Sequence, residues 1–421
     1  MVKRYLFTLF CFVFFISYSQ NGTVSPYSFF GIGDLRNSGT VDNQMMGGIS
    51  MYGDSIHINL QNPAAYSKLA LTAYTAAISH TEVRLEDFNE LQNSSVTNLD
   101  YLAIGFPLGK KVGMGFGLMP YTSLGYQLVD ERTNAAQDTI TNVFSGEGGI
   151  NRAYLSIGFE PIKNVSLGAT INYNFGNLDN QRLQTVQDVQ LGTIDRRLSK
   201  INGFDFNYAV TYTPTIKEKY TLYTFAGFDT QVNLTSENSQ RIGSFSTTTG
   251  QDIEVIDVDL DAQNLRRTEL KIPTTFKGGL GFGENKKWFV GGEYSFQKMS
   301  EFENTFLGIA NASYQDASSY AFGAYYIPNY NSITNYLSRI TYRAGVRYDV
   351  TGLVVNEQAI DNFGITFGLG LPLGNAFSNL NLGFELGRRG TTVANLVRES
   401  YLKINVGLSL NDKWFLKRKI N

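Results

Sequence analysis

Cysteine and histidine are almost absent from this sequence of 421 residues, which has one cysteine, Cys11, and two histidines, His57 and His80. Cys11 lies in the apolar part of an N-terminal leader and lacks the preceding small residues of a lipoprotein signal. The mature chain is therefore expected to contain no cysteine, which excludes a disulfide framework. An exported chain without disulfides needs a large core or a closed sheet to hold it together.

Charge is also scarce, since charged residues make up 17% of the chain against a usual value of about 25%. Removing Lys3 and Arg4 with the leader leaves 33 basic and 37 acidic residues, a net charge near −4. This balance gives no reason to expect a nucleic-acid partner.

Residues for catalysis are missing as well. Neither histidine has a cysteine or a second histidine beside it, and no nucleophile elbow is present. An acidic run from Asp252 to Asp261 can be interpreted as a divalent-cation site, but it is more typical of a solvated hairpin. The sequence predicts no enzyme, no cofactor and no metal site.

The N-terminus predicts a signal peptide over residues 1–19. Basic Met1–Arg4 precede an apolar run from Tyr5 to Ile16, and small residues follow it. The apolar run of about 12 residues is shorter than the roughly 20 that a membrane helix needs, and no later run is longer. Aromatics reach 14% and there are 42 glycines. An exported chain of this kind points to a barrel in the outer membrane of a Gram-negative bacterium, with outer-membrane lipid as its surroundings.

Side chains then alternate with a period of two residues, as in transmembrane barrel strands. From Leu167 to Phe175, apolar side chains alternate with small or polar ones. Around residues 339–348 the alternate positions include three arginines, Arg339, Arg343 and Arg347, which would not face lipid at that density. We therefore predict an all-β fold, a transmembrane antiparallel β-barrel of about 14 strands over residues 67–412. The strands are expected near 68–80, 98–107, 111–128, 150–160, 164–178, 202–214, 219–232, 270–283, 286–299, 317–327, 338–350, 361–371, 378–388 and 399–411.

The connections support a barrel better than a soluble β-sandwich, the other fold with this period. Short turns rich in proline, glycine and asparagine alternate with long polar segments at 128–149, 178–201, 233–269 and 299–316. This matches short periplasmic turns and long outer loops. A sandwich would expose a charged polar face, whereas here that face is mostly glycine, serine, threonine and asparagine.

Residues 20–66 have no sustained period, yet they are too apolar for a disordered tail. We predict that they form a hatch, or plug, inside the lumen. Methionine adapts its shape to apolar ligands, so a ligand contact and simple packing against the wall are both open interpretations of the plug. Its candidate residues are Met45, Met46, Met51, Tyr52, Asn62, Pro63 and Ala64.

Both ends of the chain resemble the long-chain fatty acid transporter family of outer-membrane proteins, in its Bacteroidota branch. The resemblance is carried by residues 25–35, Met46-Gly47-Gly48, Asn62-Pro63-Ala64 and the ending from Tyr401 to Lys419. It implies a fourteen-stranded barrel, a hatch that holds the Asn62-Pro63-Ala64 motif, and a lateral opening at a kink in the third strand. The branch also contains members that transport no fatty acid and act as partners of secretion machinery.

Two further sets of residues are candidates for function. Pro120 in the third strand cannot donate a ladder hydrogen bond, so it predicts a bulge or a gap; Met119, Pro120 and Tyr121 would border a lateral opening. Arg339, Arg343 and Arg347 form a predicted basic ladder in the lumen. It could bind a carboxylate, or pair with acidic groups among Glu293, Glu385, Asp34 and Asp54.

The preferred hypothesis is an outer-membrane channel that takes up a hydrophobic small molecule, fatty acid-like or hydrocarbon-like, which leaves sideways near strand three. The alternative is a plugged barrel that acts as a non-transporting subunit or docking partner of an outer-membrane assembly or secretion machine. Residues 413–421 are expected to form a basic periplasmic tail, whose Trp414 and Phe415 would join an aromatic girdle.

Overall fold

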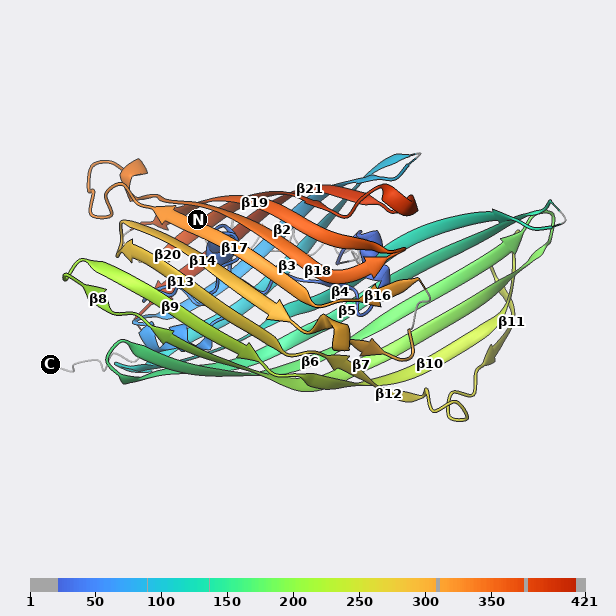
Figure 1. Cartoon of the computed structure of the whole chain (residues 1–421), viewed down its shortest axis with the longest axis horizontal. Helices are drawn as coiled ribbons and strands as arrows, with labels where there is room; N and C mark the ends of the chain where they lie inside the picture. The colour runs from blue at the N-terminus through green and yellow to red at the C-terminus, as the bar shows by residue number, and fades with distance from the viewer. Residues whose placement is uncertain (1–21, 89, 136, 308–310, 375–377, 414–421) are drawn as a thin grey trace, which may run out of the picture.

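The computed structural model describes residues 22–88, 90–135, 137–307, 311–374 and 378–413. The predicted signal peptide and nearly all of the basic tail lie outside these residues. The described chain forms a closed antiparallel β-barrel of 14 strands, which confirms the predicted fold (Figure 1).

The wall follows chain order. Two of the fourteen strands are each divided into two segments: β9 and β10 form one strand, and β12 and β13 form another. The last strand, β21, pairs with the first, β2, from Thr72↔Asp412 to Glu86↔Arg398 and so closes the barrel. The wall segments are β2 (Thr72–Glu86), β3 (Leu91–Gly109), β4 (Val112–Thr133), β5 (Thr139–Ile162), β6 (Val165–Val186), β7 (Leu191–Tyr212), β9 (Tyr220–Asp229), β10 (Val232–Ser246), β12 (Arg267–Ile272), β13 (Thr275–Glu284), β14 (Trp288–Gln297), β17 (Ala317–Tyr326), β18 (Thr341–Val355), β19 (Gln358–Leu373), β20 (Ser378–Arg389) and β21 (Arg398–Asp412).

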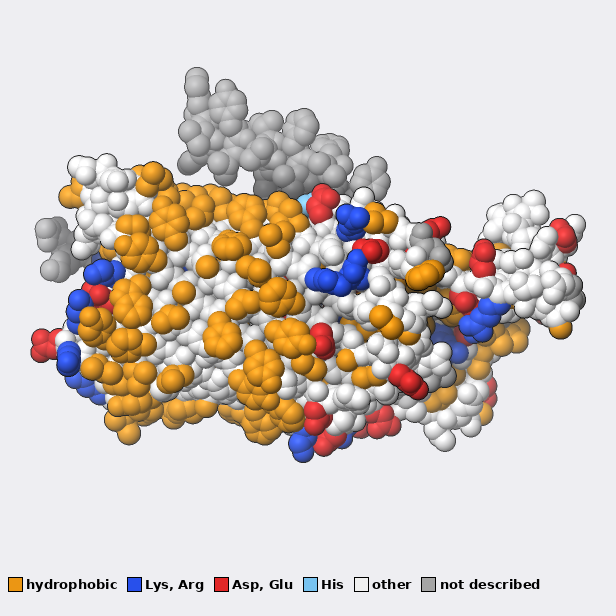
Figure 2. All heavy atoms as spheres, turned by 45° about the horizontal axis from the view of Figure 1, so that its top comes forward, with side chains coloured by type: hydrophobic (Ala, Val, Ile, Leu, Met, Phe, Trp, Pro, Cys, Tyr) orange, Lys and Arg blue, Asp and Glu red, His pale blue; other side chains and the backbone are white. Residues whose placement is uncertain are grey.

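The outer surface has a belt of apolar side chains next to the short turns (Figure 2). Outward residues such as Phe204, Val290 and Phe367 are more than half exposed in the isolated chain, at 59%, 53% and 51%. Exposure of large apolar side chains on this scale fits lipid rather than water. Among the described residues, none of the helices has the length and apolar character to cross a membrane.

Three of the predicted outer loops are largely strand. Residues 128–149 and 178–201 belong mainly to β4, β5, β6 and β7, and residues 233–269 contain most of β10, all of β11 (Asp252–Asp257) and the start of β12. These strands project beyond the rest of the barrel (Figure 1). Their sequences predict no membrane strands, because the outward series turns polar beyond the membrane and the apolar–polar alternation that marks a membrane strand ends there.

The remaining short segments lie at the two ends of the wall. They are β8 (Thr215–Ile216) and η4 (Leu337–Arg339) at the short-turn end, and η3 (Met299–Glu301), β15 (Glu303–Asn304), β16 (Ala312–Tyr314) and η5 (Val393–Asn395) at the outer end. The connection at 327–340, which carries η4, is longer than the tight turns that join the other strands at its end.

Candidate functional site

The N-terminal segment, residues 22–71, lies inside the barrel. It contains η1 (Pro26–Phe29), β1 (Asp34–Leu35), α2 (Val41–Gln44) and η2 (Pro63–Lys68), connected by irregular chain. Most of its apolar side chains are buried, among them Val41, Met45 and Met46. We refer to residues 22–71 as the plug segment.

Glycines on the inner face of the wall are the places where the plug segment touches it. A Cβ atom at Gly345 would collide with the backbone of Met46 and Gly47, and one at Gly168 with the backbone of Pro63 and Ala64. Because only glycine leaves room for so close an approach, the small residues of the inner face are explained by packing. Further contacts of this kind join Met45 to Gly368 and Gly383, Met46 to Gly323, Met51 to Gly279, Gly281 and Gly291, Tyr66 to Gly113 and Gly115, Pro63 to Gly158, and Val41 to Gly407.

Tyr52 and Asn62 have structural surroundings as well. The Tyr52 ring packs against Phe289 and Tyr325, at centroid distances of 5.0 and 5.1 Å. The Asn62 side chain caps η2, because its Oδ1 accepts a hydrogen bond from the Ala64 N–H at 3.1 Å. Its Nδ2 donates to the Ser50 carbonyl oxygen at 3.2 Å. Met45, Met46, Met51, Pro63 and Ala64 are likewise buried against the wall or within the plug segment; a ligand role for any of these residues stays a prediction.

The three arginines of the predicted basic ladder do not lie on one strand. Arg339 lies in η4, ahead of β18, and its guanidinium is 5.3 Å from the centre of the Tyr336 ring. Arg343 and Arg347 lie on β18 and face the lumen. The strand begins at Thr341, so extending the period-two pattern back to Arg339 was wrong.

Arg343 joins the wall to the plug segment. Its guanidinium forms an ion pair with Asp42 at 2.6 Å and donates to the Asn381 side-chain oxygen at 3.1 Å. His57 is close by: its Nδ1 is 2.7 Å from Asp54 and its Nε2 is 3.9 Å from Asp42. We refer to Asp42, Asp54, His57 and Arg343 as the charged latch.

Ionisation strengthens the latch. Burial alone would lower the pKa of His57, but the carboxylates of Asp54 and Asp42 raise it to about 9. Burial alone would likewise raise the pKa of Asp54, but His57 and the backbone N–H groups of Ile56 and His57 lower it to about 2. Asp54 and His57 are therefore an ion pair at neutral pH.

Farther toward the outer end, other charges are also paired. Arg347 contacts Glu385 at 2.7 Å and also Asp349, and Arg389 contacts Asp34 of the plug segment at 2.6 Å. Sequence analysis named Glu385 and Asp34 as possible partners. Asp42 is not marked by any pattern, because the plug segment has no sustained period. Arg389 continues the inward series of Asn381 and Glu385 on β20, but the predicted strand ended one residue before it.

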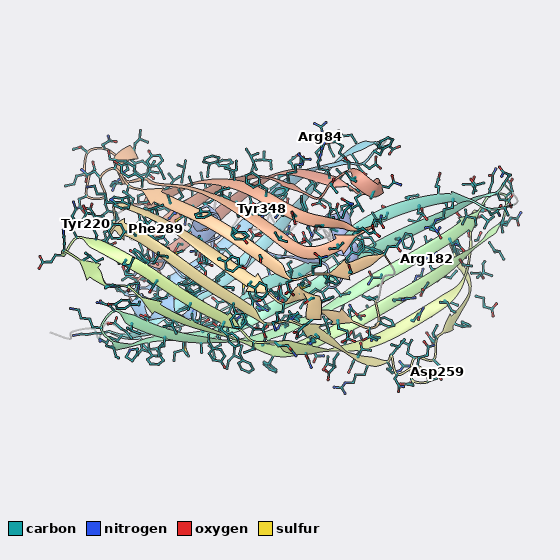
Figure 3. The ribbon with its side chains drawn as sticks, in the orientation of Figure 1. Arg84, Arg182, Tyr220, Asp259, Phe289 and Tyr348 are labelled. Carbon is teal, nitrogen blue, oxygen red and sulfur yellow. The ribbon has the colours of Figure 1, made fainter. Side chains whose placement is uncertain are left out.

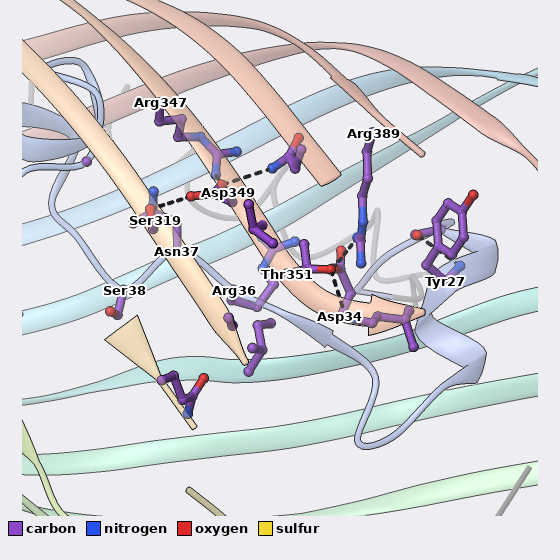
Figure 4. Close-up of a pocket in the computed structure, with 18 of the residues that line it drawn as sticks. Tyr27, Asp34, Arg36, Asn37, Ser38, Ser319, Arg347, Asp349, Thr351 and Arg389 are labelled. Carbon is purple, nitrogen blue, oxygen red and sulfur yellow. Dashed lines mark hydrogen bonds and ion pairs between the residues drawn. The ribbon is translucent and has the colours of Figure 1, made fainter. Parts of the chain in front are cut away.

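A cavity of about 490 Å³ lies between the plug segment and the inner face of the wall (Figure 4). It has apolar lining from residues such as Phe30 and Ile32, but charge is prominent. Ten of the residues that line it are acidic or basic: Asp34, Arg36, Lys277, Glu293, Arg347, Asp349, Glu385, Arg389, Glu399 and Lys403. Such a cavity favours polar contents, since sites for apolar molecules are lined mainly by apolar side chains.

The predicted lateral opening falls at an irregular part of the wall. The β4–β5 ladder has a bulge between Pro120 and Thr122, and Tyr121, the extra residue, stacks on the Arg152 guanidinium at 3.9 Å. Met119 is buried. On the other side of β4, the ladder with β3 ends at Leu102↔Leu118, and β1 of the plug segment pairs with Thr122 and Ser123.

The fold and the apolar belt define an outer-membrane β-barrel whose lumen holds its own N-terminal segment. The BamG family model matches residues 1–421, so the chain belongs to the BamG family. This family name differs from that of the fatty acid transporters, and assignment to a Bacteroidota branch stays a prediction. No curated protein matches the chain in sequence.

Solved structures share the fold at low sequence identity. The Pseudomonas putida toluene transporter TodX is 17% identical with a TM-score of 0.60, over 91% of this chain and 100% of that one. The Ralstonia pickettii toluene transporter TbuX is 12% identical with a TM-score of 0.57, over 90% and 99%. A Pseudomonas aeruginosa FadL homologue is 12% identical with a TM-score of 0.56, over 91% and 100%. The expected transporter-type barrel is therefore confirmed as a fold.

Proposed function

We propose that this protein is a plugged barrel that serves as a docking partner or subunit of an outer-membrane assembly machine and transports nothing itself. The observation that carries the proposal is the extensive contact between the plug segment and the wall. The plug segment contacts glycines on strands all around the wall, and the cavity beside it is lined by ten charged side chains. The family name BamG hints at the same role.

The energetics favour a lumen that stays closed. An apolar molecule crossing the cavity would displace water from paired charges without replacing its hydrogen bonds, which costs free energy. Moving the plug segment would also break the Arg343–Asp42 and Arg389–Asp34 ion pairs. Docking of a partner on the outside of the barrel needs neither passage through the cavity nor movement of the plug segment.

The test is extraction of the tagged full-length chain from outer membranes in mild detergent, followed by native mass spectrometry. A complex with other envelope proteins in a fixed ratio is expected. A barrel that leaves the membrane alone, with bound lipid only, would refute the docking role. The Gly278→Val chain provides a control for extraction, because a Cβ atom at Gly278 meets no atom within 4 Å.

One observation favours a second candidate, an uptake channel for hydrophobic small molecules with a lateral exit. The β3–β4 ladder ends at Leu102↔Leu118, so the wall is interrupted beside Pro120. The interruption begins where the apolar belt ends. On the neighbouring strand β5, the outward side chains change from Ala153 to the exposed, polar Asn151, and Asn151 pairs with Pro120. An exit here would open at the outer rim of the membrane. Uptake of labelled toluene or a fatty acid by cells that carry the protein, absent from cells that lack it, would support this candidate.

A further inference from the structure

Strand β4 separates from its neighbour β3 above Leu118. In the described chain, β3 pairs with β4 only from Leu102↔Leu118 to Gly109↔Val112, and above that point β3 stays with β2. The opposite edge of β4 is paired with β5 up to Thr133↔Thr139. The tips of the β2–β3 and β4–β5 hairpins are accordingly far apart in Figure 1. One edge of the upper part of β4 therefore has no wall strand beside it.

The plug segment occupies only the beginning of this edge. Asp34 and Leu35 pair with Ser123 and Thr122. The Arg36 N–H donates to the Tyr121 carbonyl oxygen at 3.0 Å, and the Gly125 N–H donates to Ser28 Oγ at 3.2 Å. Among the described residues, no strand pairs with this edge beyond Ser123.

These two hydrogen bonds identify which backbone groups are open. In an antiparallel ladder, successive residues direct their N–H and C=O groups to opposite edges. The backbone groups of Tyr121 and Gly125 are directed to this edge. The backbone N–H and C=O groups of Gln127, Val129 and Glu131, which continue the same alternation, are therefore directed to it too. We call these three positions the open edge.

The open edge lies beyond the membrane. The outward side chains of β4 are Phe116, Leu118 and Pro120 in the belt, and Gln127 further on is exposed. The neighbouring strands extend with it, and Arg182 of β6 lies on the same projecting part (Figure 3). A partner would therefore reach the open edge from the aqueous phase.

An unpaired strand edge in water is a template for another strand, and natural proteins usually block it with charge or proline. Here the charges come only at the tip, at Asp130, Glu131 and Arg132, while residues 124–129 carry none. The same edge already accepts β1. Strand addition at such an edge is a known mode of peptide binding.

We propose that the open edge of β4 binds an extended segment of a partner protein as an added β-strand. This inference rests on the proposed docking function and names the surface and the kind of partner. The partner contributes main-chain hydrogen bonds to Gln127, Val129 and Glu131, so its segment needs an extended conformation without proline at the paired positions.

Val129→Pro tests the inference, since it removes one open N–H and leaves the ladder with β5 intact. Proline is tolerated where the N–H of an edge strand faces solvent, so the barrel should fold. Val129→Thr keeps the N–H and the β-branched shape and is the matched control. Loss of one backbone hydrogen bond should reduce the partner retained on the full-length chain by about tenfold in Val129→Pro, with no loss in Val129→Thr.

Amide hydrogen exchange gives a second measure on the same preparations. The amides of Gln127, Val129 and Glu131 should exchange at least about tenfold more slowly in the extracted complex than in the barrel stripped of partners. The amides of Leu128 and Asp130 face β5 and should be protected in both.

The outcomes are distinguishable. A complex that survives Val129→Pro in full, or open-edge amides that exchange equally fast in both preparations, would overturn the inference and leave the docking function standing. Absence of any complex with the unsubstituted chain would overturn both. A complex made only of copies of this chain would overturn the added strand from a partner.

Discussion

The inner face of the barrel is built differently at its two ends. Near the short turns, glycines such as Gly345 and Gly168 let the backbone of the plug segment lie directly on the wall. Toward the outer end, the wall faces the plug segment with arginines and acidic residues in pairs, such as Arg389 with Asp34. Glycine contacts and the charged latch hold the short-turn end, and further ion pairs hold the outer end, so a solute would have to break both kinds of contact.

The largest expected effect is at the charged latch. Arg343→Met removes the guanidinium 2.6 Å from Asp42 and leaves that buried carboxylate only the more distant His57 as a cation, which should destabilise the folded barrel by up to about 3–5 kcal/mol. The temperature at which the barrel unfolds in detergent gel assays should fall. The double variant Arg343→Met with Asp42→Leu removes both charges and should recover much of the loss; no recovery would contradict the pairing.

Crowding a glycine contact should have a smaller effect. Gly345→Val places side-chain atoms against Gly47, and overpacking of this kind costs about 1–3 kcal/mol. Gly278→Val is the matched control, because a Cβ at Gly278 meets no atom within 4 Å. Heat stability of the two variants in the same assay checks the prediction, and equal stability would show that the glycines are not contact sites.

A pH series should act on the charged latch. The pKa of His57 is raised from 6.5 to about 9, so its contribution is complete below pH 6.5 and is lost as the pH rises through about 9. The pKa of Asp54 is lowered from 3.8 to about 2, so its contribution is complete above about pH 4 and is lost as the pH falls toward 2. Unfolding temperatures from pH 6 to 10 should decline in the natural chain and stay flatter in His57→Gln.

The smallest effect is expected at the bulge. Pro120→Val restores a backbone donor and suits a strand, so stability should rise by up to about 1 kcal/mol. Under the docking account, uptake of labelled toluene is absent before and after the change. Uptake that is present in the natural chain and falls in the variant, at matched surface levels, would favour the lateral-exit candidate.

The membrane part of the fold was predictable because lipid on one side forces a period-two pattern, as in Leu167–Phe175. The projecting strands were not, because the outward series of β6 turns polar after Phe175, at Asn177, Asp179 and Gln181. Arg343 and Arg347 lie on the inward positions of β18 that the period-two pattern predicts. The partner of Arg343, Asp42, lies where the irregular plug segment places it, and no periodicity in the sequence encodes the path of that segment. The gap between β3 and β4 depends on where two distant hairpins diverge, and Pro120 alone indicates only a bulge.

Planar-bilayer recording tests the central claim, that the lumen is closed and the protein acts through what docks on it. The full-length chain should show no steady conductance. Deletion of residues 22–66 should open a pore, because the lumen of a fourteen-stranded barrel is wider than side chains of the wall can fill. Conductance in the intact chain equal to that of the deletion variant would contradict the account.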